Sequence, residues 1–128
     1  MISFRHVSKS FGPKTVLSDV SFDIADGEIF FIIGASGVGK SVLIKHLVGL
    51  LRADAGDILL DGTEVSRLDE KAMFPIRKKC AMVFQHSTLF DSMTLVENVA
   101  LPLRKHGGLR SGRALDEARR RLDEVHLA

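Results

Sequence analysis

The fold of this 128-residue chain is decided by one stretch, Gly34-Ala35-Ser36-Gly37-Val38-Gly39-Lys40-Ser41. Its spacing matches G-x-x-x-x-G-K-[S/T], the pattern of a phosphate-binding loop. The glycines allow backbone angles at which successive N–H groups point at one anion, and the following helix presents its positive dipole end to the same phosphates. In this pattern Lys40 supplies a charge for the β- and γ-phosphates, and Ser41 supplies a hydroxyl ligand for Mg²⁺.

The segments on either side of the loop have the expected character. The apolar run 28–33 predicts a strand buried on both faces of a parallel sheet. The helix predicted at 40–51 carries one apolar stripe, formed by Leu43, Leu47, Leu50 and Leu51. A glycine-rich turn without a ligand is the alternative, and this strand-then-helix context disfavours it.

The rest of the chain reads as a mixture of strands and helices. Alternating and short apolar runs predict strands at 2–9, 16–24, 57–60, 63–65 and 80–84. Helices are expected at 69–79, with Pro75 near a start or a kink, at 94–103 as a short helix or turn, and at 113–127. This order predicts an α/β fold with its ligand at the carboxyl ends of strands, together with an antiparallel β portion.

Composition excludes several classes of protein. Hydrophobic residues make up 45% and charged residues 27%, as in ordinary soluble globular proteins, which excludes a disordered tail or a disulfide scaffold. The lone Cys80 fits a reducing compartment, and neither a signal sequence nor a membrane span is evident. The net charge of +2 is too small to indicate nucleic-acid binding.

Four features together resemble the ATP-binding subunit of an ABC transporter, over residues 2–128. Residues 4–12 resemble the first strand and aromatic adenine-binding loop of that family, and residues 16–27 its second strand and turn. Residues 34–41 match its Walker A motif, and residues 83–99, which include Val83-Phe84-Gln85, resemble its Q-loop region. The resemblance implies a P-loop NTPase core, an antiparallel β subdomain and the start of a helical subdomain.

The resemblance also implies ATP and Mg²⁺ as cofactors. The cofactor-binding residues would be Phe11, Gly34, Ala35, Ser36, Gly37, Val38, Gly39, Lys40, Ser41, Val42 and Gln85, with Ser41 and Gln85 as metal ligands. Phe11 would stack on adenine, unless it packs in the core. Gln85 would contact Mg²⁺ and the attacking water, unless it is a surface glutamine. Val42 stands where many such loops carry a second hydroxyl, so we expect weaker contact with the α-phosphate there.

A finer resemblance concerns the transported substrate. Residues 40–50 and 89–94 resemble the bacterial lipid-trafficking branch, which includes the Mla-type phospholipid and solvent-tolerance transporters. This implies an integral-membrane permease, a second ATP-binding subunit and an MCE-domain lipid-binding protein as partners, and no nucleic acid. Residues 85–98 would help to receive a coupling helix of the permease. The expected location is cytoplasmic, peripheral on the inner face of the bacterial inner membrane.

Several family motifs do not occur within these 128 residues: the signature, a Walker B aspartate with the catalytic glutamate, and the switch histidine. We therefore expect residues 1–128 to be the N-terminal part of one ABC ATP-binding domain, with no assignable catalytic residue, no appreciable ATPase activity alone and an exposed apolar sheet face. Three alternatives remain open: a soluble ABC ATPase acting on DNA or ribosomes, a small phosphoryl-transfer kinase, and a non-catalytic nucleotide binder. The run Arg119-Arg120-Arg121 is expected to be a solvated helix face.

Overall fold

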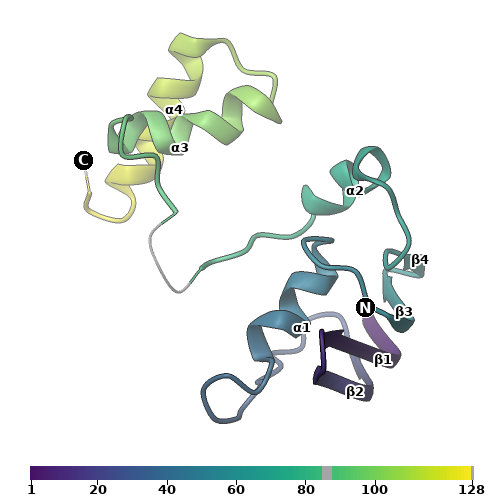
Figure 1. Ribbon diagram of the computed structural model, residues 1–128. Coiled ribbons are helices and arrows are strands. Elements are labelled where there is room, and N and C mark those ends of the chain that lie inside the picture. The colour runs from purple at the N-terminus through teal and green to yellow at the C-terminus, as the bar shows by residue number, and fades with distance from the viewer. Residues whose placement is uncertain (85–87, 128) are drawn as a thin grey trace. The chain divides into compact units, whose positions relative to one another are not determined.

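The computed structural model describes residues 1–84 and 88–127, and the chain divides into two compact units, Met1–Ala81 and Met82–Ala128 (Figure 1). The first unit holds a sheet, two helices and the phosphate-loop stretch, and the second holds two helices. No helix in the described part of the chain is long and apolar enough to cross a bilayer.

The first unit is built on a four-stranded antiparallel sheet of order β2-β1-β3-β4. Its strands are β1 (Ile2–Phe11), β2 (Lys14–Ile24), β3 (Ala55–Leu60) and β4 (Thr63–Glu64). Asp61 and Gly62 join β3 to β4 with positive φ angles of 50° and 76°, as a type I′ hairpin turn requires. The strands predicted at 2–9, 16–24, 57–60 and 63–65 are therefore confirmed, and they form antiparallel pairs.

Irregular pairing bends the central strands. The register of β1 with β2 shifts between Phe4 and Val7, and the register of β1 with β3 shifts after Arg5. His6 and Asp19 take positive φ angles of 51° and 53° at this place, and His6 Nδ1 lies 2.7 Å from Asp19 Oδ1. Such bulges add a residue to one strand and increase its twist.

One hydrophobic cluster joins the sheet to its helices, α1 (Lys40–Leu47) and α2 (Glu70–Arg77). Its buried members are Phe4, Val7, Leu17, Leu43, Ile58, Leu60, Val65, Met73 and Ile76. Phe4 stacks on Phe22 at 4.7 Å between ring centroids, and Phe22 stacks on Phe30 at 5.1 Å. Phe30 thereby attaches the segment before the phosphate loop to the sheet.

Two predicted strands are wrong. Residues 29–33 and 80–84 form no strand, and Phe31, Ile33 and Val83 are largely exposed. A strand needs a neighbour for its backbone hydrogen bonds, and no described strand pairs with either run in the sheet β2-β1-β3-β4. The expected parallel sheet is therefore not seen among the described residues, whereas the exposure of apolar residues at 29–33 was expected.

Helix α1 is shorter than its predicted range because glycine ends it. Gly49 has φ +66°, its N–H donates to His46 O at 3.1 Å, and the Leu50 N–H donates to Lys45 O at 2.9 Å. This is the Schellman arrangement of helix termination. Helix α2 is confirmed, with Asp69 as its N-cap accepting from Ala72 N at 2.8 Å, and Pro75 lies inside it.

The second unit pairs α3 (Leu95–Lys105) with α4 (Ser111–Asp123), which confirms both predicted helices. Thr94 and Glu97 form a reciprocal capping box at the start of α3. The Asn98 side chain closes the preceding turn with hydrogen bonds of 2.8–3.1 Å to the backbone of Phe90, Met93 and Thr94. The exposed segment before α3 is therefore held by polar contacts.

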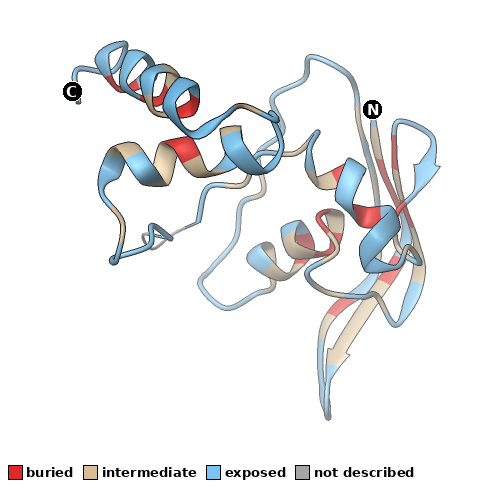
Figure 2. Ribbon diagram, turned by 90° about the horizontal axis from the view of Figure 1, so that it is seen from above, coloured by how far each residue is buried: buried red, intermediate tan, exposed pale blue. Residues whose placement is uncertain are grey.

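Helix α4 buries one narrow stripe. Its buried positions are Ala114, Ala118 and Leu122, which recur every four residues and lie along one side of the helix (Figure 2). On the solvent side Glu117 accepts from Arg120 and Arg121 at 2.8 Å, and these hydrogen bonds lower the pKa of Glu117 to about 2. The three adjacent arginines are thus a solvated face, as predicted, and each has an acidic partner.

Replacing Gly56 by alanine should destabilise the first unit strongly. Gly56 has φ +86°, and a Cβ there would lie 2.3 Å from His6 O and 2.4 Å from Arg5 O. Gly62, at φ +76°, is the matched control because nothing lies within 4 Å of its Cβ position. We expect Gly62→Ala to cost about 1–2 kcal/mol through its backbone angle alone, and Gly56→Ala more than about 3 kcal/mol. Urea unfolding followed by circular dichroism measures both, and equal losses would contradict the close contact.

Acid should weaken α4 through Glu117. A carboxylate with a lowered pKa stabilises the folded state above its ordinary pKa of 4.5, and this contribution is lost as the pH falls toward about 2. We expect Glu117→Gln to lower helicity at 222 nm at neutral pH, and the difference from the parent chain to shrink as the pH falls from about 4.5 and to vanish only below about pH 2. A difference that did not change with pH would show that the Arg120 and Arg121 pairs contribute nothing.

Candidate functional site

The phosphate-loop stretch forms an open turn that leads directly into α1. Gly37 and Gly39 have φ angles of 80° and 103°, in the left-handed region that favours glycine. Gly39 is the N-cap of α1 and provides no side-chain cap, and the first turn of the helix holds no acidic residue. The first N–H groups of α1 therefore have neither a side-chain cap nor an acidic residue within the first turn, which suits an anion.

Lys40 reaches back over the loop. Its ammonium donates to Gly34 O and to Ala35 O, both at 2.6 Å. An ammonium group has three N–H donors, so one remains for another acceptor. The two carbonyls therefore hold the ammonium at the loop rather than along the helix.

Close packing fixes the loop against β2. A Cβ on Gly39 would lie 2.7 Å from Val16 Cγ1 and 3.1 Å from Val16 O, so only glycine fits at this point. Leu43, one turn further along α1, belongs to the core and donates its N–H to Gly39 O at 2.9 Å. The start of α1 is therefore positioned by the sheet and the core together.

Of the other predicted site residues, Ser41 and Val42 lie beside the phosphate loop, at the start of α1. Ser41 is exposed at the start of α1, next to Lys40, and Val42 is partly buried against the core. Phe11 ends β1 at the hairpin turn, 46% exposed, with Lys9 Nζ 5.5 Å from its ring centroid. Since Phe11 lies outside the core cluster, the core-packing alternative for it is wrong. Gln85 lies outside the described residues.

Few side chains at the phosphate loop could act as ligands of a magnesium ion. No group of three His, Cys, Asp or Glu side chains able to hold a metal occurs in the described ranges 1–84 and 88–127. Ser41 contributes a single hydroxyl oxygen, and Mg²⁺ prefers six oxygen ligands and retains several waters. The residues present therefore fit a Mg²⁺ that is held mainly by nucleotide phosphates and water, with Ser41 as one ligand.

His46 is a feature of the site region that the sequence analysis missed. His46 is 1% exposed on α1, and its Nδ1 lies 2.6 Å from Val42 O. Its buried Nε2 has no hydrogen-bond partner among the described residues. A histidine on the inner side of the predicted apolar stripe was the available signal. The capping box of Thr94 and Glu97 was also missed, although its S/T-x-x-E pattern is visible in the sequence.

Comparison with known proteins identifies the family. The model of the ABC transporter family matches residues 17–128, which include the loop, α1 and the whole second unit. The chain belongs to the ABC transporter family. As a member of this family, it contains the Walker A loop described above as residues 34–41.

Several relatives resemble the chain over its whole length. The probable ribonucleotide transport ATP-binding protein mkl of Mycobacterium leprae is 40% identical over 98% of this chain and 36% of its own length. The methionine import ATP-binding protein MetN of Rhizobium johnstonii is 42% identical over the full chain and 35% of its own length. The chain thus spans about a third of the curated relatives it matches.

Solved structures agree with the fold. The ATP-binding cassette MJ0796, in a dimeric post-hydrolysis state bound to ADP and Pi, matches all of this chain and 58% of its own with a TM-score of 0.88 at 29% identity. A second dimeric structure of MJ0796 gives the same TM-score at 30% identity. The predicted ABC ATPase fold class is therefore confirmed for the part of the cassette that this chain covers.

The contact between Gly39 and β2 gives a prediction for the stability of the phosphate loop. Gly39→Ala should lower the free energy of unfolding by about 2–4 kcal/mol, because the methyl group must displace Val16 and the backbone angle is unfavourable. Gly37→Ala, at φ +80° with nothing within 4 Å, should cost only about 1–2 kcal/mol. Urea unfolding of both variants checks the order, and a Gly37 variant as unstable as the Gly39 variant would contradict it.

Proposed function

We propose that this chain is the nucleotide-binding part of the ATP-binding subunit of an ABC transporter. The observation that carries the proposal is the Lys40 ammonium, held over the loop by Gly34 O and Ala35 O at 2.6 Å beside the uncapped N-terminus of α1. A fixed cation and aligned N–H groups on one side of an open turn match a polyphosphate.

Each predicted residue has a defined part in binding. The backbone of residues 34–39 and the first turn of α1 would surround the β-phosphate, and Lys40 would donate its remaining N–H to a β- or γ-phosphate oxygen. Ser41 would ligate Mg²⁺, which supplies charge neutralisation of the phosphates when bound. Phe11 would stack on adenine through its exposed face. Gln85 would contact Mg²⁺ and the attacking water, as the family resemblance implies.

Hydrolysis and transport are proposed for the complete subunit. Within the described residues no Asp or Glu is hydrogen-bonded to residues 34–41, so we assign no general base at the loop from these residues. The complete ATPase would act as a dimer with a second ATP-binding subunit and drive an integral-membrane permease. MJ0796 is dimeric in its solved structures, which supports the dimer. The proposed location is the cytoplasmic face of the bacterial inner membrane.

The transported substrate is a separate question. Our prediction of phospholipid or related lipid transport, with an MCE-domain partner, is based on residues 40–50 and 89–94. The relatives described above are named for methionine import and ribonucleotide transport, and neither name supports a lipid. We retain lipid transport as the proposal from the sequence, with methionine import as its competitor.

Lys40→Ala tests nucleotide binding directly. A charged hydrogen bond contributes about 1.5–3 kcal/mol, so we expect about tenfold or greater weakening of binding to an N-methylanthraniloyl derivative of ATP. The chain contains no Trp and no Tyr, so anisotropy of the directly excited label is free of protein fluorescence. Lys45→Ala removes the same charge from the same helix, away from the loop, and serves as the matched control.

The two variants separate binding at the loop from a general effect of charge. Loss of affinity in the Lys40 variant with parent-like affinity in the Lys45 variant supports the proposal. Equal affinities in both variants and the parent chain, with circular dichroism showing folded protein, would refute a phosphate role for Lys40.

A further inference from the structure

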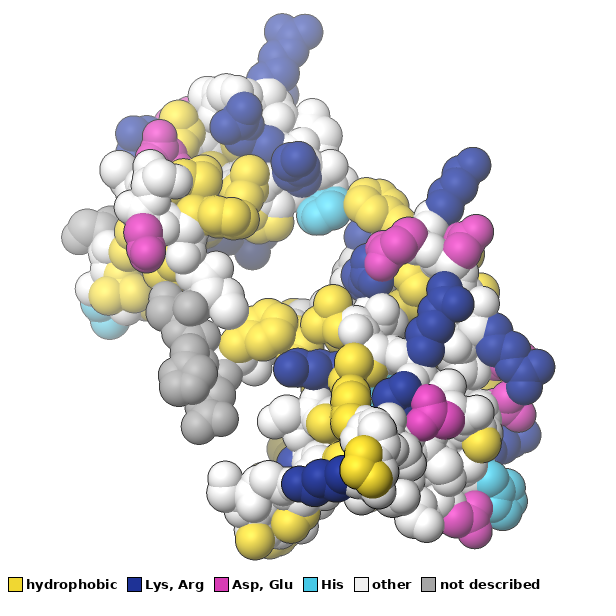
Figure 3. Space-filling view, viewed as in Figure 1, with side chains coloured by type: hydrophobic (Ala, Val, Ile, Leu, Met, Phe, Trp, Pro, Cys, Tyr) yellow, Lys and Arg dark blue, Asp and Glu magenta, His cyan; other side chains and the backbone are white. Residues whose placement is uncertain are grey.

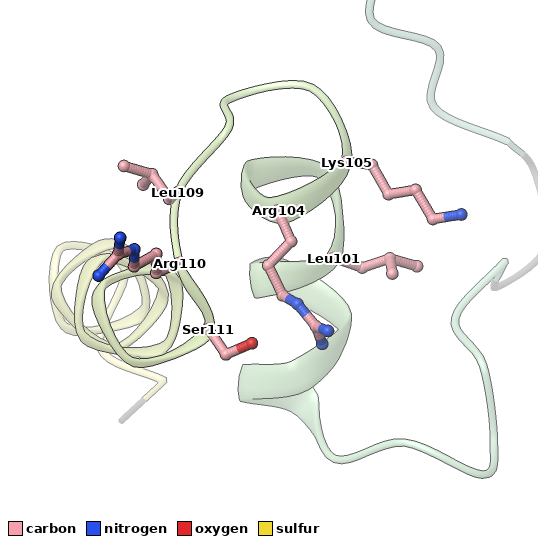
Figure 4. Close-up of a pocket in the computed structure, with 6 residues that line it drawn as sticks. All are labelled: Leu101, Arg104, Lys105, Leu109, Arg110 and Ser111. Carbon is pink, nitrogen blue, oxygen red and sulfur yellow. The ribbon is translucent and has the colours of Figure 1, made fainter.

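A basic pocket lies between the end of α3 and the start of α4. Its lining residues are Leu101, Arg104, Lys105, Leu109, Arg110 and Ser111. The pocket has a volume of about 530 Å³, and an adjoining hollow of about 550 Å³ adds Arg113 to its rim. Figure 4 shows Arg104 extending from α3 toward Ser111, while Lys105 and Arg110 spread outward.

The four cations of the basic pocket are not ion-paired with any described acidic residue. Within the described part of the chain, no ion pair involves Arg104, Lys105, Arg110 or Arg113, and all four are exposed. The sequence from 98 to 115 contains no Asp or Glu. Glu97 attracts Arg104 only from a distance, because its carboxylate is engaged by Thr94. The positive charge of this surface is therefore uncompensated.

The neighbouring arginines of α4 differ in this respect. Arg119 pairs with Asp116, Arg120 with Glu117 and Glu124, and Arg121 with Glu117. Both groups belong to the same small unit, yet only the group around the turn between the helices keeps its charge available. Within the described part of the α3–α4 unit, the cations without an ion pair therefore gather around this turn.

We propose that the basic pocket binds the phosphates of anionic phospholipid headgroups, so that the α3–α4 unit contacts a membrane surface. Guanidinium groups match phosphate oxygens with two parallel hydrogen bonds, and three of the four cations are arginines. Figure 3 shows dark blue Lys and Arg side chains beside yellow hydrophobic ones on the visible face of this unit.

Two features favour a lipid surface over a single free phosphate. The cations line two hollows of about 530 and 550 Å³ that share Leu109 and Arg110, so they can meet more than one headgroup. Leu101 also lines the pocket and is partly exposed, whereas Leu109 packs against the small core of the unit. An apolar side chain such as Leu101 gains by contact with the glycerol and acyl boundary but not with inorganic phosphate. This inference does not depend on ATP binding.

Vesicle co-sedimentation of the full chain tests the proposal. The probes are vesicles of phosphatidylcholine mixed with phosphatidylglycerol and vesicles of phosphatidylcholine alone. The double variant Arg104→Gln/Arg110→Gln should bind the anionic vesicles about 25-fold more weakly, since each basic residue near such a surface contributes about fivefold. The control Arg119→Gln/Arg121→Gln changes the net charge equally and should lose less than about threefold, because these arginines are already paired.

Each outcome decides the proposal. Selective loss in the Arg104/Arg110 variant, with binding of the parent chain that falls at high salt, supports it. Equal binding to vesicles of phosphatidylcholine alone would overturn it, because the exposed apolar segment at 29–33 would then explain the attachment. If inorganic phosphate at constant ionic strength releases the chain from the anionic vesicles, the pocket binds a small phosphate. If a short DNA duplex releases it, the pocket binds nucleic acid. Either result overturns the lipid assignment. Circular dichroism confirms that both double variants are folded.

Discussion

The contact of Gly39 with Val16 is the constraint on which the candidate site depends. At this point the loop backbone lies against β2 with no space for a side chain, and α1 begins at the next residue. Leu43 then enters the same core as Phe4 and Leu17. The direction of α1, the orientation of its first N–H groups and the reach of Lys40 are all set from this contact. The antiparallel sheet therefore supports the phosphate loop directly, through Val16 and through the shared core.

Elements that depend on local chemistry could be predicted from the sequence. The type I′ turn at Asp61-Gly62 carries its own signal, and the helices follow apolar periodicity and capping residues. The runs 29–33 and 80–84 have an equally clear apolar signal, but a buried strand depends on partners distant in the chain. Hydrophobicity indicates that a segment should be covered, and it does not say by what. This explains why the strands predicted at 2–9, 16–24, 57–60 and 63–65 were right and those predicted at 28–33 and 80–84 were wrong.

For the candidate site, the motif predicted the residue types but not their contacts. The left-handed angles of Gly37 and Gly39 follow from the G-x-x-x-x-G-K pattern. The hydrogen bonds of Lys40 to Gly34 O and Ala35 O do not, since a flexible side chain chooses among nearby acceptors only once the backbone is folded. The basic pocket shows the same limit. Its residues are unremarkable in sequence, and what sets them apart is that three neighbouring arginines find acidic partners whereas these do not.

The bulge at His6 and Asp19 has a consequence for how β2 meets other molecules. β2 is an edge strand, and a long regular edge presents a continuous row of backbone groups to any other chain. Asp19, at φ +53° and engaged with His6, breaks that row near the middle of the strand and places a carboxylate on it. A second copy approaching this edge finds two short runs out of phase with each other. The irregularity thus protects the sheet from stacking edge to edge into larger assemblies.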